Sequence, residues 1–112
     1  METTVAVEGF SAMGSESRLA VLQTLVKAGP KGLPVGEIQK RTNIPASTLA
    51  HHLKFLAAAH LVEQDKQGRS IINRADFTHL EALAEFILRE CCADQDTSSQ
   101  SNAPSEKELV HD

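Results

Sequence analysis

One stretch of the chain, residues 43–61, constrains the fold more than any other. It reads NIPASTLAHHLKFLAAAHL, and Leu49, Leu53 and Leu56 recur at the i, i+4, i+7 spacing of one helical face. Pro45 precedes this stripe, and its fixed φ and missing N–H suit the start of a helix. The polar side chains away from the stripe are Ser47, Thr48, His51, His52 and Lys54. The stretch therefore predicts an amphipathic helix with a buried leucine face and a polar outer face.

A second helix is predicted immediately before this one, over residues 34–42, with Val35 and Ile38 facing inward. Residues 43–45 are left for the connection between the two helices. Two helices joined by a turn of three or four residues form a helix-turn-helix. In DNA-binding proteins with this motif, the second helix lies in the major groove. We therefore expect residues 43–61 to read duplex DNA.

The hydrophobic period changes from 3.6 to about 2 after this helix, which predicts a β-hairpin over residues 61–74. Its turn is expected at residues 66–69, where Gly68 supplies the positive φ of a tight hairpin. Lys66 and Arg69 lie in the same turn and would reach a phosphate or a minor groove. A hairpin directly after a recognition helix is a wing.

Three further helices complete the predicted fold. The first covers residues 5–13, the second begins at the N-cap Ser15, and the last runs from the N-cap Asp76 to about residue 92. The last helix has a broader apolar face than a small core can cover, so we expect a homodimer paired through the first and last helices. The predicted dimer-interface residues are Val7, Phe10, Phe77, Leu80, Ala84 and Ile87. The expected fold class is mainly α with a small β-hairpin (α+β), a winged helix-turn-helix.

The chain divides into one domain and a tail. Its 112 residues, 41% apolar and 23% charged, are typical of a single small globular domain, which we place at residues 1–92. Residues 93–112 are rich in Ser, Asp and Gln and are expected to form a flexible polar tail. No apolar run reaches 18 residues, and the N-terminus lacks a basic segment followed by an apolar one. We therefore expect a cytoplasmic protein without a membrane partner.

The charge distribution agrees with a DNA-binding surface although the net charge is −4. Residues 34–74 contain six Lys and Arg against three acids, so the acidic excess lies in the rest of the chain. A basic face rather than a basic total supplies phosphate affinity and steering. The same fold could also serve only protein–protein contact, and steep salt dependence of duplex binding would separate these two interpretations.

Three motifs together resemble the ArsR/SmtB family of winged-helix repressors. They are residues 14–19 (GSESRL), residues 47–56 (STLAHHLKFL) and residues 68–70 (GRS). The resemblance extends over about residues 5–92. It implies a homodimer that binds an imperfect inverted repeat in promoter DNA and is released when an effector binds.

The resemblance also implies roles for single residues. The predicted DNA-binding residues are Ala46, Ser47, Thr48, Ala50, His51, Lys54, Lys66 and Arg69. Thr48 stands where relatives contact the DNA backbone, and His52 stands where they are partly buried against the wing. Ala46 and Ala50 replace the Gln and Ser that are common at these positions, although an Ala methyl can pack on a thymine methyl. The direct base code is therefore expected to be thin.

Two of the effector sites known in relatives are not expected here. One needs a cysteine pair in the third helix, and residues 34–42 contain no cysteine. Another binds zinc on the last helix with carboxylate and histidine ligands from each chain. Asp76 and His79 are present, but no later histidine in that helix completes a four-ligand zinc site. We interpret these two residues as a helix cap and a surface residue.

The adjacent thiols Cys91 and Cys92 remain as the candidate effector site. Two soft thiolates suit a thiophilic ion. Some arsenic-responsive relatives carry such a pair at the end of the last helix, followed by a third cysteine that this chain lacks. Arsenite favours three thiolates, whereas a methylated trivalent arsenical needs two. The predicted effector is therefore a trivalent arsenical, methylarsenite before arsenite or antimonite, and no intrinsic cofactor is expected.

Other interpretations of the cysteine pair stay open. Adjacent helical side chains point about 100° apart, so both sulfurs reach one ion only if the helix end frays or two chains cooperate. Cys91 could instead be a small apolar residue buried at the dimer face. The pair could also form a disulfide in a redox-responsive repressor. A thiol oxidoreductase would need the C-x-x-C spacing that is missing, so the sequence predicts no enzyme.

Overall fold

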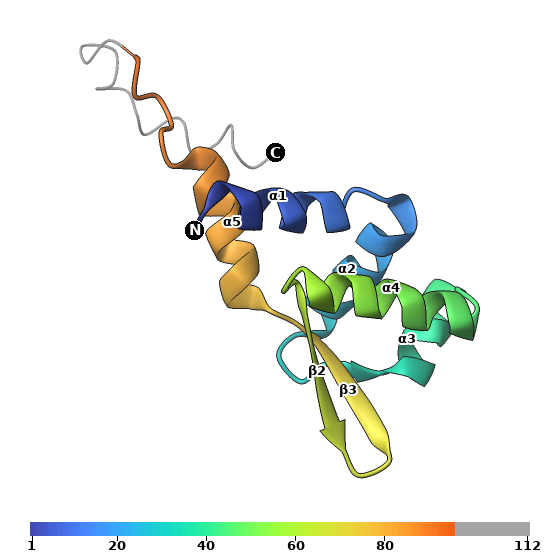
Figure 1. The fold of residues 1–112 in the computed structure, drawn as a ribbon. Coiled ribbons are helices and arrows are strands. Elements are labelled where there is room, and N and C mark those ends of the chain that lie inside the picture. Colours follow the sequence, from blue (N-terminus) through green and yellow to red (C-terminus); the bar gives the residue numbers. More distant parts are fainter. Residues whose placement is uncertain (96–112) are drawn as a thin grey trace.

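The computed structural model describes residues 1–95, and Figure 1 shows how their helices and strands are arranged. The elements are α1 (Thr3–Ala12), α2 (Glu16–Ala28), β1 (Leu33–Pro34), α3 (Val35–Thr42), α4 (Ala46–Ala58), β2 (Val62–Gln67), β3 (Ser70–Ala75) and α5 (Phe77–Leu88). The order confirms the predicted winged helix-turn-helix. The predicted tail, residues 93–112, lies outside the described residues except for residues 93–95.

The leucine stripe of α4 is buried as predicted. Leu49, Leu53 and Leu56 are each at most 1% exposed, and α4 packs against α2 and α3. The core around them contains Val21 and Leu25 of α2 and Ile38, Leu61 and Leu83 from the other elements. Burying a leucine side chain stabilises a fold by about 1.5–3 kcal/mol, so the stripe fixes which side of α4 remains in solvent.

The helix-turn-helix connection has the predicted length of three residues. Asn43 ends α3 in the left-handed conformation, with φ 63°, which asparagine tolerates better than most residues. The Thr42 hydroxyl donates to the Ile38 carbonyl at 2.8 Å and accepts from the Ile44 N–H at 3.3 Å. Pro45 is the N-cap of α4 rather than its first helical residue. These local bonds fix the angle at which α4 leaves α3.

The recognition helix is three residues shorter than predicted at its C-terminus. It ends at Ala58, and His60 takes a left-handed conformation with φ 68°. The N–H of His60 donates to the Ala57 carbonyl, and the N–H of Leu61 donates to the Leu56 carbonyl. This pair of bonds is a Schellman motif, which satisfies the last carbonyls and turns the chain toward the hairpin.

The hairpin forms a three-stranded antiparallel sheet of order β1-β3-β2 and extends away from the helices (Figure 1). Gln67 pairs with Ser70, so the turn consists of Gly68 and Arg69, with φ 64° at Gly68. The positive φ at Gly68 is as predicted, but the prediction of a four-residue turn over residues 66–69 is wrong. Lys66 lies in β2 opposite Ile71, because the pairing continues to the two-residue turn.

Strand β1 has no signal in the sequence, because it contains two residues and one of them is proline. It joins the sheet through the fully buried Asn73, whose Nδ2 donates to the Leu33 carbonyl at 3.4 Å. Asn73 Oδ1 accepts from Gln64 Nε2 at 2.9 Å, so this side chain links all three strands. Gly32 permits the close approach, because a Cβ there would collide with the Asn73 backbone.

Helices α1 and α5 pack against each other beside the helix-turn-helix core (Figure 1). A Cβ added to Gly9 would lie 2.9 Å from Leu83 Cδ1, so Gly9 allows the two helices to meet closely. Asp76 caps α5 as predicted, accepting from the His79 N–H at 3.0 Å. The predicted end of α5 near residue 92 is wrong, since the helix ends at Leu88. Every side chain from residue 87 to 95 is exposed, so no packing supports further helix.

Helix α2 buries only part of the apolar face that its spacing indicates. Ser15 is its N-cap as predicted, accepting from the Arg18 N–H at 3.3 Å. The helical spacing of Leu19, Leu22, Leu25 and Val26 predicts one apolar face. Leu22 and Leu25 are buried as this spacing predicts, together with Val21, whereas Leu19 and Val26 are 38% and 42% exposed. Among residues 1–95 no helix combines the length and apolarity that crossing a membrane requires.

Replacing Leu53 by Ala should lower the free energy of unfolding by about 2–5 kcal/mol, because it leaves a cavity under the recognition helix. Urea unfolding followed by circular dichroism measures this change. Leu19→Ala is the matched control and should cost about 1 kcal/mol, since Leu19 lies at the outer side of α2. Equal losses for both variants would contradict the packing of these two helices.

Candidate nucleic-acid interface and effector site

The predicted DNA-binding residues lie in two exposed groups, one on α4 and one on the hairpin. All eight are exposed: Ala46, Ser47, Thr48, Ala50, His51 and Lys54 on α4, and Lys66 and Arg69 on the hairpin. The buried leucine stripe leaves the α4 group on the solvent side of the helix. The structure thus presents every predicted contact residue to solvent, whereas contact with DNA itself stays a prediction.

The cations of residues 34–74 differ in whether an acid neutralises them. On α3, Glu37 pairs with Arg41 at 3.1 Å and with Lys40 at 3.9 Å. On the sheet, the Arg74 guanidinium lies 3.5 Å from Asp65 and 4.0 Å from Glu63.

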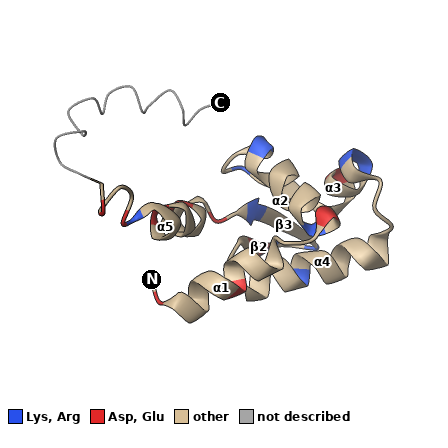
Figure 2. Cartoon of the chain, turned by 90° about the horizontal axis from the view of Figure 1, so that it is seen from above, with Lys and Arg blue, Asp and Glu red and all other residues tan. Residues whose placement is uncertain are grey.

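Lys54, Lys66 and Arg69 make no such ion pair within the described residues. Lys54 is also the only charged residue of α4, as the colouring of Figure 2 shows. The three cations that sequence reasoning assigned to DNA are therefore the three of this region that lack an acidic partner among residues 1–95. Such side chains are available for phosphate oxygens.

Arg18 links three helices at the back of this surface. Its Nε donates to the Ala12 carbonyl at the end of α1 at 2.6 Å. Its guanidinium lies 4.2 Å from the centroid of the Phe55 ring on α4, in a cation–π contact. Sequence analysis gave Arg18 no role of its own. The available signal was its spacing, since Arg18 lies four and seven residues before the apolar Leu22 and Leu25 of the same predicted helix.

The two histidines of α4 lie in different environments. His51 is exposed, with its ring 6.5 Å from Phe55 in an edge-on arrangement. His52 is half-buried, and its Nδ1 is buried without a hydrogen-bond partner in the described residues. Burial lowers the pKa of His52, and the charges of Arg18 and His51 lower the pKa further. A neutral His52 suits a packing role rather than contact with a phosphate.

Cys91 and Cys92 lie beyond the last helix and are exposed, with their sulfur atoms 3.5 Å apart. The N–H of Cys91 donates to the Leu88 carbonyl at 2.7 Å, and Cys92 has a positive φ of 63°. The divergence of adjacent helical side chains does not apply, because both residues are in turns rather than in a helix. The two thiols therefore point to one place without fraying or a second chain.

No cluster of three or more His, Cys, Asp or Glu side chains in residues 1–95 could hold a metal ion. Asp76 is used as a helix cap, since its Oδ1 accepts from the His79 N–H. The His79 ring lies 5.7 Å from that of His60, and its Nε2 is buried without a partner in this part of the chain. Asp76 is therefore the helix cap that was predicted, whereas His79 is half-buried and not the predicted surface residue.

The predicted dimer-interface residues form a partly uncovered apolar surface on α1 and α5. Val7, Ala84 and Ile87 are exposed, with 57% of Val7 and 63% of Ile87 accessible. Phe10, Phe77 and Leu80 are half-buried. Leu88, which is 59% exposed, extends the same end of α5. Such a surface is larger than scattered single apolar residues and is typical of an interaction site.

Comparison with known proteins identifies the same kind of domain. A family model described as a helix-turn-helix domain matches residues 13–65. The uncharacterized HTH-type transcriptional regulator YceK of Bacillus subtilis is 39% identical over 61 residues, which are 54% of this chain and 60% of that protein. The transcriptional activator HlyU of Vibrio cholerae is 31% identical over 87 residues, which are 78% of each chain.

A solved structure extends the similarity to nearly the whole chain. It is an ArsR-like transcriptional regulator from Rhodococcus sp. RHA1, with a TM-score of 0.69 and 25% sequence identity. The superposition covers 96% of this chain and 93% of that one.

Proposed function

Because this chain belongs to the ArsR/SmtB family of winged helix-turn-helix transcriptional regulators, we propose that it is a homodimeric repressor whose operator is an inverted repeat in duplex DNA. A thiophilic effector, most favourably a trivalent arsenical, would release it from that DNA. Residues 1–92 would form the DNA-binding and dimerisation domain, and residues 93–112 a polar tail. A regulator of promoters in this form would act in the cytoplasm.

The observation that carries DNA binding is the position of Lys54, Lys66 and Arg69. They lie on the exposed side of α4 and on the hairpin, and they have no acidic partner among the described residues. Cations that have no acidic partner in the protein can neutralise DNA phosphates and release the counterions bound to them. This release supplies affinity for any duplex, whatever its sequence. The two groups would contact the major groove and the flanking backbone at once.

Sequence preference would come from few direct contacts. Ser47 and His51, both exposed, would be the polar side chains that face the bases, and Thr48 would bind the backbone. Ala46 and Ala50 can only offer methyl groups, which favour the methyl of thymine. Much of the specificity would therefore depend on the spacing of two α4 helices in a symmetric dimer and on the shape of the DNA.

Replacing Arg69 by Ala should weaken binding to every duplex, whatever its sequence, because the lost contact is with phosphate. The slope of log affinity against log salt should fall by about one per protomer. Fluorescence anisotropy with a labelled promoter fragment at several salt concentrations measures both effects.

Arg89→Ala is the matched control, since Arg89 directly follows α5, and the C-terminal end of α5 lies away from the hairpin (Figure 1). Its salt slope should equal that of the unmodified protein. An unchanged slope for Arg69→Ala would remove the hairpin from the DNA contact.

The apolar surface on α1 and α5 carries the proposal of a homodimer. A chain of this size buries a limited core, and Val7, Ile87 and Leu88 remain more than half exposed in the single chain. Two-fold pairing through this surface would bury them and would place two recognition helices in symmetric positions. An inverted repeat in DNA has the same symmetry.

Ile87→Asp should raise the dissociation constant of the dimer at least tenfold, because a charge would have to be buried in an apolar interface. Analytical ultracentrifugation over a range of protein concentrations measures the change. Ile71→Asp places the same charge on an exposed isoleucine of β3 and should leave the dimer intact. Dissociation of both variants, or of neither, would argue against this interface.

The effector site is proposed at Cys91 and Cys92. Sulfur atoms 3.5 Å apart can approach a single thiophilic atom after small side-chain rotations. A methylated trivalent arsenical has one valence taken by carbon and binds two thiolates, so it requires no third ligand. The same proximity favours a second candidate. Two thiols and one molecule of hydrogen peroxide would give a vicinal disulfide and two molecules of water.

Serine at both positions should leave DNA affinity unchanged and abolish release by methylarsenite, because hydroxyls do not bind trivalent arsenic as thiolates do. Each single serine variant should weaken the response about 100-fold or more, since the chelate is lost. A mobility shift with promoter DNA and increasing methylarsenite measures the response.

Peroxide in a parallel series separates the two candidates. Release by peroxide alone that dithiothreitol reverses would favour the redox switch. Release of the double serine variant by methylarsenite would show that the effector binds elsewhere.

A further inference from the structure

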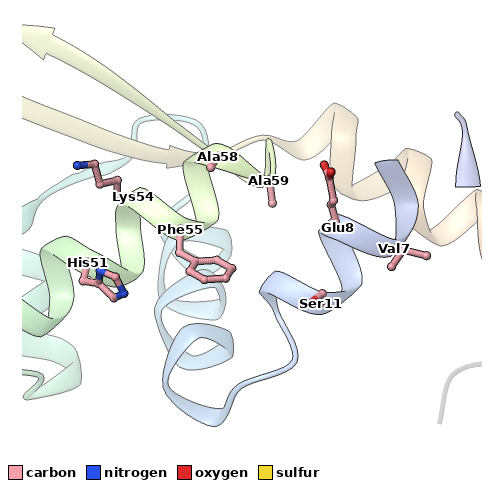
Figure 3. Close-up of a pocket in the computed structure, with 8 residues that line it drawn as sticks. All are labelled: Val7, Glu8, Ser11, His51, Lys54, Phe55, Ala58 and Ala59. Carbon is pink, nitrogen blue, oxygen red and sulfur yellow. The ribbon is translucent and has the colours of Figure 1, made fainter. Parts of the chain in front are cut away.

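A groove of about 600 Å³ lies between α1 and the recognition helix α4, and the function proposed above assigns no ligand to it. Its lining comes from Val7, Glu8 and Ser11 on α1 and from His51, Lys54, Phe55, Ala58 and Ala59 at α4. Figure 3 shows His51 and Lys54 at one end, Val7 and Glu8 at the other, and the Phe55 ring between them. Clefts of about 300–1,000 Å³ are typical of sites for small organic ligands.

The interior of the groove is apolar and is not filled by the chain itself. Phe55 is 42% exposed although it is aromatic, and Val7, which also belongs to the proposed dimer surface, is 57% exposed in the single chain. One face of the ring is covered by the Arg18 guanidinium at 4.2 Å. Ala58 and Ala59 have small side chains and leave space beside the ring. A flat or chain-like apolar group would gain contact with these surfaces and remove them from water.

The charges at the two ends favour one polarity of ligand. Lys54 and His51 lie together at one end of the groove, and α4, which carries both, contains no acidic residue. Glu8, on α1, lies at the other end of the groove. Neither Glu8 nor Lys54 forms an ion pair within the described residues. An anionic group would therefore be attracted by Lys54 and repelled by Glu8, which fixes the direction in which the ligand lies.

We propose that this groove binds an amphipathic organic anion, with its acidic group at Lys54 and His51 and its apolar body against Phe55 and Ala58. Lys54 and His51 are also predicted DNA contacts, so the bound anion and the operator compete for the same two side chains. The site is separate from Cys91 and Cys92 and gives the regulator a second input. Binding of a ligand to the groove requires no DNA, so it can be measured separately from the DNA binding that the proposed function requires.

A ligand in the groove also affects DNA binding indirectly, through the two helices that form its walls. One wall is α1, which carries part of the proposed dimer surface, and the other is α4. Arg18 already connects them, because it donates to the Ala12 carbonyl of α1 and stacks on Phe55. A ligand beside Phe55 changes the packing at this connection and so the placement of α4 relative to the dimer axis.

The probe is 8-anilinonaphthalene-1-sulfonate, an aromatic anion that fluoresces in apolar sites. The full chain contains no Trp or Tyr, so the protein adds little fluorescence of its own. Titration of the dimer without DNA should show saturable enhancement. Ala58→Leu fills the groove and should weaken binding at least about fivefold. Ala20→Leu, at an exposed alanine of α2, should leave it unchanged.

A second variant tests the charge argument. Glu8→Gln removes the repulsive carboxylate and should tighten binding of the anion about two- to fivefold. Unlabelled promoter duplex should displace the probe from the unmodified protein, because both require Lys54 and His51. Circular dichroism of each variant verifies the fold, and duplex affinity of Ala58→Leu should equal that of the unmodified protein.

Two results would overturn the proposal. Equal enhancement by the unmodified protein and Ala58→Leu would place the probe elsewhere, for example on the apolar ends of α1 and α5. Enhancement that arises only when Ile87→Asp dissociates the dimer would show that the second copy covers the groove. A protein that binds the probe in the groove but binds no duplex would contradict the proposed function and would still support the groove as a ligand site.

Discussion

The burial of Leu49, Leu53 and Leu56 against α2 and α3 is the interaction on which the rest of the structure depends. It turns α4 so that every residue predicted to contact DNA lies outside the core. It also brings the C-terminus of α4 to the point where the Schellman motif at His60 directs the chain into β2. The position of the recognition helix and that of the wing thus have one physical origin, the removal of leucine surface from water.

Ion pairs within α3 and across the hairpin then decide which charged groups remain available. Glu63 and Asp65 take up the charge of Arg74 on the sheet, and Glu37 takes up that of its neighbours on α3. Among the cations of residues 34–74, those without an acidic partner in the described residues lie on α4 and the hairpin. Arg18 is used differently, since it holds the end of α1 and the Phe55 ring together. The same helix α4 therefore presents cations to solvent and forms one wall of an apolar groove.

The effector region shows why local patterns describe some parts of a chain poorly. Periodicity predicts a last helix that extends to about residue 92, but an apolar face stabilises a helix only where it packs, and the side chains of residues 87–95 are exposed in the described part of the chain. The short hydrogen bonds that follow give Cys92 a positive φ and bring the two sulfurs together. Adjacent side chains diverge on a helix, but Cys91 and Cys92 follow the end of α5 at Leu88, so this divergence does not prevent a shared thiolate site.

The sequence by itself determined the fold class, the leucine stripe, the caps at Ser15 and Asp76, the three-residue turn and the hairpin glycine, because each follows from interactions within a few residues. Only the tertiary structure decided the rest: the exposure of Leu19 and Val26 on α2, strand β1 held by Asn73, the acidic partners of Arg74, and the groove beside Phe55. These features depend on which surfaces meet across long stretches of chain, and such contacts leave no periodic signal in the sequence.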